Sequence, residues 1–168
     1  TLLNEYLTAM TDVIFRWEGT LDKFVGDEIM VFWGAPLPQA DHAERALRCA
    51  LEMRQRLVEL QQKWREQGLE ALDAGIGINS GEVLVGNIGA EGKKMDYTII
   101  GDHVNLGARV EALTRNYGAP ILLTAQTIEA IKKSSGGVLP EDLEVCEIDE
   151  VAVKGREEKV KVYAPESI

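Results

Sequence analysis

Cysteine and histidine are scarce in this sequence. It contains two of each, and Cys49 and Cys146 lie far apart without a CxxC pair. A structural zinc site needs about four clustered Cys or His ligands, so the sequence argues against one. Disulfides are not required for folding either, because a chain of 168 residues can bury enough apolar surface without them. This cysteine usage is typical of a protein in the reducing cytosol.

Long hydrophobic runs and an excess of positive charge are also missing. No apolar run approaches the ~20 residues that span a membrane, and no signal peptide is recognisable. We therefore expect no direct membrane insertion and a cytoplasmic location for this domain, whether or not the parent protein is attached to a membrane. The sequence has 28 acidic and 18 basic residues, a formal net charge of -10. This balance argues against nucleic acid or an anionic membrane surface as the main partner, but a small anionic ligand needs only a few cations.

The apolar spacing predicts one α+β domain. Helical spacing is found at 1–17, 41–68, 101–116 and 125–133. Strand-like runs are found at 20–25, 28–34, 71–81, 82–89, 96–100, 121–123, 143–148 and 159–163. Because there is no strict βαβ alternation, we expect a sheet layered with helices. Locally, we expect Gly19 to end the first helix, Asp41 and Glu44 to form a capping box, and 82–89 to be the hairpin partner of 71–81.

The turn Gly26-Asp27 joins two predicted strands and offers a carboxylate at its tip. Such a carboxylate is well placed to bind a hard cation such as Mg²⁺. Gly-Asp is also a common turn pair, so a purely structural turn stays open. Lys23, beside the predicted core, is either a lysine that reaches solvent from a strand end or a fixed donor to a ligand.

Asn105 and Arg109 are four residues apart in the predicted helix 101–116, so they share one helix face. This face is offset from the apolar stripe of Leu106, Val110 and Leu113. Asparagine has a poor propensity for a helix interior. An amide and a guanidinium that project together could bind a phosphate-bearing ligand. A surface arginine beside a tolerated asparagine is the alternative.

Lys154 precedes Gly155 just before the last predicted strand. A cation followed by glycine can approach a phosphate closely. The same pair is typical of a solvated turn, and the pair alone favours the turn.

Together and in this order, these motifs resemble the catalytic domain of the class III adenylate and guanylate cyclases. The matching segments are Phe24–Asp27 with the apolar strand after it, Gly75–Gly81, Ile100–Arg109 and Val153–Gly155. The resemblance is greatest to bacterial adenylate cyclases with Lys and Thr at the base-reading positions. It implies a ferredoxin-like core with an antiparallel-rich sheet, and active sites that form between the two chains of a head-to-tail homodimer.

The resemblance also implies roles for single residues. Asp27 matches the second of the two metal-binding aspartates of the family. Lys23 matches the lysine that reads the adenine ring, and Thr98 matches the second base-reading residue. Guanylate cyclases typically carry Glu, and Cys or a small residue, at these two base-reading positions.

Three further residues match the part of the family site that handles ribose and phosphate. Asn105 matches an asparagine that orients the ribose, and Arg109 matches the arginine that stabilises charge at the transferred phosphorus. Lys154 matches the lysine that holds the terminal phosphates.

One part of the family pattern is missing. The first metal-binding aspartate of the family lies on an initial strand that also cradles the phosphates, and this strand should precede the helix at 1–17. We therefore expect residues 1–168 to be a single class III cyclase catalytic domain that is N-terminally incomplete. The partner aspartate of Asp27 is expected outside these residues.

The implied reaction converts ATP to 3′,5′-cyclic AMP and pyrophosphate, with two Mg²⁺ or Mn²⁺ ions per site. We also expect regulatory domains elsewhere in the parent protein. A guanylate cyclase is the rival enzyme. A catalytically silent dimerisation or nucleotide-sensing domain is the rival from another class. The presence of Asp27, Asn105 and Arg109 argues against a silent domain, and the missing first aspartate argues for one.

Overall fold

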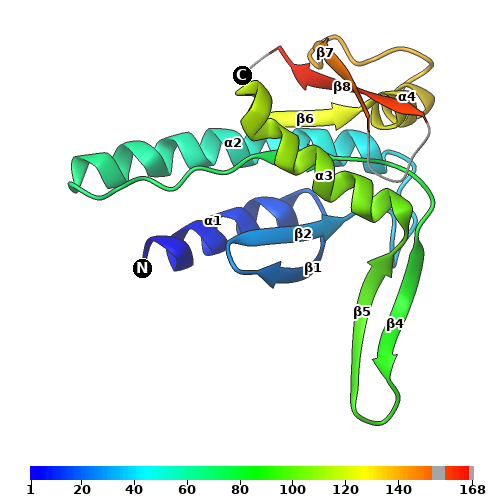
Figure 1. Ribbon diagram of the computed structural model, residues 1–168, viewed down its shortest axis with the longest axis horizontal. Helices are drawn as coiled ribbons and strands as arrows, with labels where there is room; N and C mark the ends of the chain where they lie inside the picture. The colour runs from blue at the N-terminus through cyan, green and yellow to red at the C-terminus, as the bar shows by residue number, and fades with distance from the viewer. Residues whose placement is uncertain (153–157, 167–168) are drawn as a thin grey trace.

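The computed structural model describes residues 1–152 and 158–166, and its elements follow the order predicted from the sequence (Figure 1). The helices are α1 (Leu2–Arg16), α2 (His42–Glu66), α3 (Asp102–Tyr117) and α4 (Ala125–Ser134). The strands are β1 (Thr20–Val25), β2 (Glu28–Phe32), β3 (Ile76–Ile78), β4 (Leu84–Ala90), β5 (Lys94–Ile100), β6 (Ile121–Thr124), β7 (Val145–Ala152) and β8 (Lys159–Pro165). The predicted α+β class is confirmed. No helix among the described residues is long and apolar enough to cross a membrane.

The described strands form three separate sheets. One sheet has four strands in the order β3-β6-β8-β7, and the other two are the hairpins β1-β2 and β4-β5. The pair β3-β6 is parallel, and the other pairs are antiparallel. The β4-β5 hairpin projects away from the body of the molecule (Figure 1).

The predicted hairpin between segments 71–81 and 82–89 is wrong. Only three residues of the first segment form a strand, and this strand takes β6 as its partner. The second segment contributes β4, which pairs along its whole length with β5. Strand pairing depends on contacts between distant segments, so two neighbouring strand-like runs need not pair with each other.

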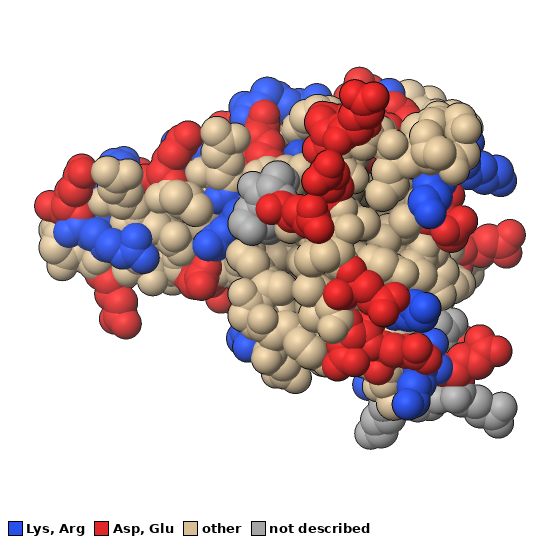
Figure 2. Space-filling model, turned by 90° about the horizontal axis from the view of Figure 1, so that it is seen from above, with Lys and Arg blue, Asp and Glu red and all other residues tan. Residues whose placement is uncertain are grey.

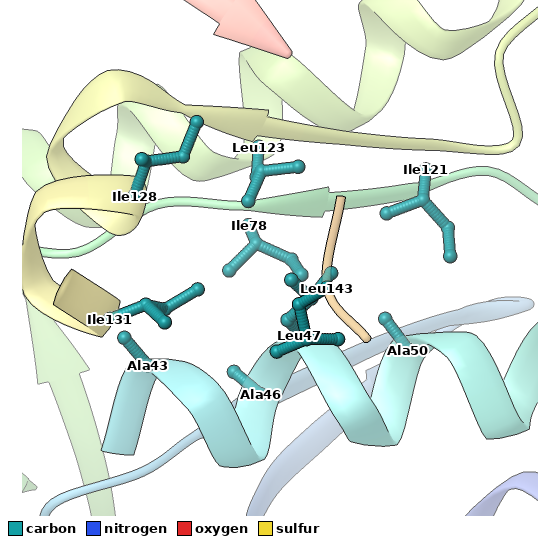
Figure 3. Close-up of a cluster of buried hydrophobic side chains, with 10 residues drawn as sticks. All are labelled: Ala43, Ala46, Leu47, Ala50, Ile78, Ile121, Leu123, Ile128, Ile131 and Leu143. Atoms are coloured by element: carbon teal, nitrogen blue, oxygen red, sulfur yellow. The ribbon is translucent and has the colours of Figure 1, made fainter. Parts of the chain in front are cut away.

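The main hydrophobic core lies between α2, α4 and one face of the four-stranded sheet (Figure 3). Its fully buried side chains include Leu47, Ile121, Leu123 and Ile131. A second cluster, with Leu106, Val110, Leu122 and Val162, lies under α3. Burial of one such side chain stabilises the fold by roughly 1.5–3 kcal/mol. The sheet is therefore covered on both faces, by α2 and α4 on one side and by α3 on the other.

Both predictions about helix ends are wrong in detail. Helix α1 ends at Arg16, and Glu18, not Gly19, adopts the left-handed conformation, with φ 57°. Gly19 is needed for another reason, because a Cβ there would lie 2.8 Å from the Trp33 ring. Asp41 is the N-cap of α2 but makes no side-chain cap hydrogen bond. Its carboxylate accepts instead from Arg45 Nε at 2.7 Å, and this ion pair replaces the predicted capping box.

The glycine-rich segment before residue 81 lies against α3. A Cβ added to Gly77 would lie 2.2 Å from the backbone nitrogen of Glu111 in α3. A Cβ added to Gly75 would lie 1.9 Å from the hydroxyl oxygen of Thr114. Backbone packs on backbone at Gly77, so no side chain can be accommodated there.

We predict that Gly77→Ala destabilises the fold by about 1–3 kcal/mol or more, the usual cost of overpacking, because α3 must move away from β3. Gly86→Ala is the matched control, since a Cβ at Gly86 meets nothing within 4 Å. The control should change stability by less than about 0.5 kcal/mol. Urea unfolding of both variants measures this difference, and equal stabilities would contradict the close packing of α3 on β3.

Candidate active site

Helix α3 presents the two polar residues singled out from the sequence. Asn105 and Arg109 are exposed, whereas Leu106 and Val110 on the offset stripe are buried. Neither polar side chain has a hydrogen-bond or ion-pair partner among residues 1–152 and 158–166. The predicted common face is therefore available to a ligand.

The first turn of α3 is held in place by Asn79, a role that was not predicted from the sequence. Its Nδ2 donates to the carbonyl oxygen of His103 at 2.9 Å, and its Oδ1 accepts from Thr124 Oγ1 at 2.7 Å. A Cβ at Gly81 would collide with the His103 ring, 2.4 Å away. Asn79 thus joins the end of β3, the end of β6 and the start of α3. The sequence signal that could have indicated this role is the position of Asn79, a polar residue directly after a strand.

The β1-β2 hairpin carries Lys23 and Asp27. Gly26 has φ 63°, a conformation that glycine adopts without strain, so the tight turn forms as predicted. Lys23 and Asp27 are both exposed, and neither side chain is hydrogen-bonded or ion-paired within the described part of the chain.

The donor chemistry of Asp27 fits a hard divalent cation, which prefers carboxylate oxygen. No group of three or more His, Cys, Asp or Glu among the described residues could hold a metal ion. Asp27 can therefore supply one carboxylate ligand to Mg²⁺, outside any cluster of three such residues in the described structure.

Thr98 is the buried residue of β5. Its residue exposure is 7%, while Tyr97 and Ile100 beside it are exposed. The Thr98 hydroxyl donates to Asp22 Oδ2 at 2.6 Å, which links β5 to β1. Phe32 in β2 and Tyr97 in β5 make a second link, with ring centroids 6.2 Å apart. Thr98 therefore lies against the strand that carries Lys23. The contribution of Asp22 to this arrangement was not predicted from the sequence.

The predicted site residues thus fall into two groups. Lys23, Asp27 and Thr98 lie on the two hairpins, and Asn105 and Arg109 lie on α3. Lys154 lies outside the described residues. Two surface hollows of the described structure are lined by other residues, one around 139–145 and one along α2. The candidate site is therefore an open surface rather than a closed pocket of one chain.

Acidic side chains gather on the face that carries β7 and β8 (Figure 2). The exposed members include Glu141, Asp142, Glu144, Glu147 and Glu150. Such a face repels phosphate, so an anionic ligand must be held by cations elsewhere. Arg109 and Lys23 are exposed cations on other elements.

The fold is an α+β domain whose surface exposes a carboxylate, an amide and two cations that have no partners among the described residues. Residues 1–166 match the family model described as the adenylate and guanylate cyclase catalytic domain. The chain belongs to this family, as the motifs predict.

Individual relatives support this assignment. The chain is 34% identical over 166 residues to an adenylate cyclase of Anabaena cylindrica, and the alignment covers 96% of this chain and 31% of that protein. It is 38% identical to the guanylyl cyclase Cya2, with a TM-score of 0.84 and coverage of 98% of this chain and 78% of that one. It is also 38% identical to the adenylyl cyclase CyaB from P. aeruginosa, with a TM-score of 0.85 and coverage of 98% and 80%.

Overall sequence similarity does not distinguish ATP from GTP as the nucleotide. The chain is equally similar in sequence to a guanylyl and to an adenylyl cyclase of known structure. It spans less than a third of the length of the curated adenylate cyclases that it matches. Selectivity between adenine and guanine therefore depends on single side chains, such as those on β1 and β5.

Proposed function

We propose that this chain is the catalytic domain of an adenylate cyclase, which converts ATP to 3′,5′-cyclic AMP and pyrophosphate. One observation carries the proposal. The motif residues Lys23, Asp27, Asn105 and Arg109 are all exposed and unpaired within the described structure. The described fold makes no contact that occupies these side chains, so they are free to bind a ligand, which supports the roles that the family motifs imply.

Each group has a distinct task in this reaction. Lys23 and Thr98 bind the adenine ring, and Asn105 orients the ribose so that its 3′-oxygen is in line with the α-phosphorus. Arg109 stabilises the negative charge that develops at this phosphorus. Lys154 holds the terminal phosphates. Because no covalent intermediate is needed, the residues contribute mainly orientation and charge stabilisation.

Asp27 is the proposed ligand for a divalent cation. Mg²⁺ or Mn²⁺, two ions per site, would supply charge neutralisation at the phosphates and a lowered pKa for the 3′-hydroxyl. Exposure of Asp27 at the tip of a hairpin supports this role, since the carboxylate can reach a ligand that is bound to another chain.

A second copy of the chain is the proposed partner, in a head-to-tail homodimer. Large apolar side chains are exposed on the same two hairpins that carry Lys23, Asp27 and Thr98. They are Phe24, Val25, Leu84, Met95, Tyr97 and Ile100. Exposed apolar groups of this kind are typical of interaction surfaces. Asp27 of one chain would then complete the site formed by Arg109 of its partner, with two sites per dimer.

A guanylate cyclase is the second candidate, and it is favoured by the 38% identity to Cya2. Lys23 and Thr98 favour an adenylate cyclase over a guanylate cyclase. Lysine donates a hydrogen bond, and adenine N1 accepts one, whereas guanine presents a donor at N1.

We predict that Arg109→Ala lowers kcat by about 10²–10³-fold and changes KM much less, because the guanidinium acts on charge that develops in the transition state. Arg115→Ala is the matched control on the same helix, since Arg115 is paired with Glu111 and is exposed. Steady-state kinetics of the full-length protein measure both variants. Near-normal turnover without Arg109 would exclude this role.

We predict that inactive Asp27→Ala and Arg109→Ala chains recover activity when they are mixed. A random equimolar mixture contains about one half heterodimers, each with one intact site of two, so about a quarter of the wild-type rate is expected. Cyclic AMP production after co-refolding or subunit exchange measures the recovery. No recovery in a sample with demonstrated heterodimers would place the whole site within one chain.

We predict that the unmodified protein prefers ATP to GTP, and that Lys23→Ala reduces kcat/KM for ATP more than for GTP. Both follow from the donor that Lys23 offers to adenine N1. Initial rates with each nucleotide under identical metal concentrations measure the preference. A clear preference for GTP would replace the adenylate proposal with its rival.

A further inference from the structure

A β-bulge in β1 places Asp22 beside Thr98. Leu21 lies opposite Val31, and Lys23 lies opposite Met30, so Asp22 is an extra residue on this strand. A bulge interrupts the regular alternation of side chains and redirects the extra residue. Here the Asp22 carboxylate points from the β1-β2 hairpin to β5, where it accepts a hydrogen bond from Thr98.

The direction of this hydrogen bond limits what Thr98 can offer to a ligand. A threonine hydroxyl has one proton to donate and two lone pairs that accept. A carboxylate can only accept, so the single proton of Thr98 is directed to Asp22 Oδ2, 2.6 Å away. The hydroxyl oxygen then has only acceptor capacity left.

We propose that Asp22 is a positioning residue that sets base choice, by fixing the Thr98 hydroxyl as a hydrogen-bond acceptor. This inference rests on the proposed function, in which Thr98 contacts the base. Adenine carries an exocyclic amine, which donates, where guanine carries a carbonyl oxygen, which accepts. An acceptor-only hydroxyl bonds the amine and opposes the carbonyl. A freely rotating hydroxyl would bond either group.

The surroundings of the pair support this role. Thr98 is 7% exposed, so an unfavourable hydrogen-bond arrangement there is poorly relieved by water. Asp22 directly precedes Lys23, the other proposed base-reading residue. One short segment of β1 would thus supply both the donor for adenine N1 and the residue that orients Thr98.

The test is Asp22→Asn in the full-length protein. The amide has the same shape but can accept from or donate to Thr98, so it no longer fixes the direction of the hydroxyl proton. We expect the ratio of kcat/KM for ATP to that for GTP to fall by about tenfold, the effect of one mismatched hydrogen bond at a buried group. Asp96→Asn is the matched control, because Asp96 lies on β5 two residues from Thr98 and its only ion pair in the described structure is with Lys94. It should leave the ratio unchanged.

Thr98→Val separates a role through Thr98 from any other role of Asp22. Valine keeps the shape of threonine and lacks the hydroxyl. If Asp22 acts through Thr98, Asp22→Asn should not change the ATP/GTP ratio further in the Thr98→Val background. A purely structural role of the Asp22–Thr98 bond would lower both rates alike and leave the ratio as it was, and this result would overturn the inference.

Equilibrium binding gives a readout that does not depend on turnover. In the Arg109→Ala background, titration calorimetry with ATP and with GTP should show the same loss of preference when Asp22→Asn is added. ATP preference that Asp22→Asn leaves unchanged would overturn the inference alone. Binding of neither nucleotide by the folded protein would overturn the proposed function and the inference with it.

Discussion

Helix α3 lies directly on the backbone of β3 at Gly77, and its Thr114 side chain lies against the backbone of Gly75 just before this strand. Asn79 fixes the start of the helix through hydrogen bonds to His103 and Thr124. Asn105 and Arg109 project from this helix into solvent without partners of their own in the described structure. Their position is therefore determined by the packing of the helix backbone and not by any contact that a ligand would have to break.

The two hairpins differ from α3, because they do not pair with the four-stranded sheet. β1-β2 and β4-β5 are separate sheets, and the Asp22–Thr98 hydrogen bond and the Phe32–Tyr97 ring contact join them. Their outer surfaces carry exposed apolar side chains. One half of the proposed site thus lies on a packed helix, and the other half lies on two hairpins with exposed apolar side chains. These exposed side chains support the proposed homodimer, in which a partner chain would cover them.

The sequence predicts the order of the elements because helices and strands bury side chains with regular periods. It places Lys23 and Asp27 on one hairpin and Asn105 and Arg109 on one helix face because these motifs are local, and the roles of these residues stay predictions. It fails for the partner of β4, since strand pairing is decided by residues distant in the chain. It also misses Asp22 and Asn79, which act through hydrogen bonds to residues 76 and 24 positions away. For Asp22, the bulge also breaks the alternation from which a side-chain direction is read.

The charge distribution is compatible with the proposed binding of an anionic substrate by an acidic chain. Six arginines pair with carboxylates in the described structure, namely Arg16, Arg45, Arg48, Arg54, Arg56 and Arg115. Arg109 has no such partner there, although the chain carries 28 acidic residues. At physiological salt, charges more than about 8 Å apart are largely screened, so the acidic surface over β7 and β8 acts weakly on a distant phosphate. Salt screens a contact between a guanidinium and a phosphate much less, so Arg109 can attract a phosphate locally despite the net charge of -10.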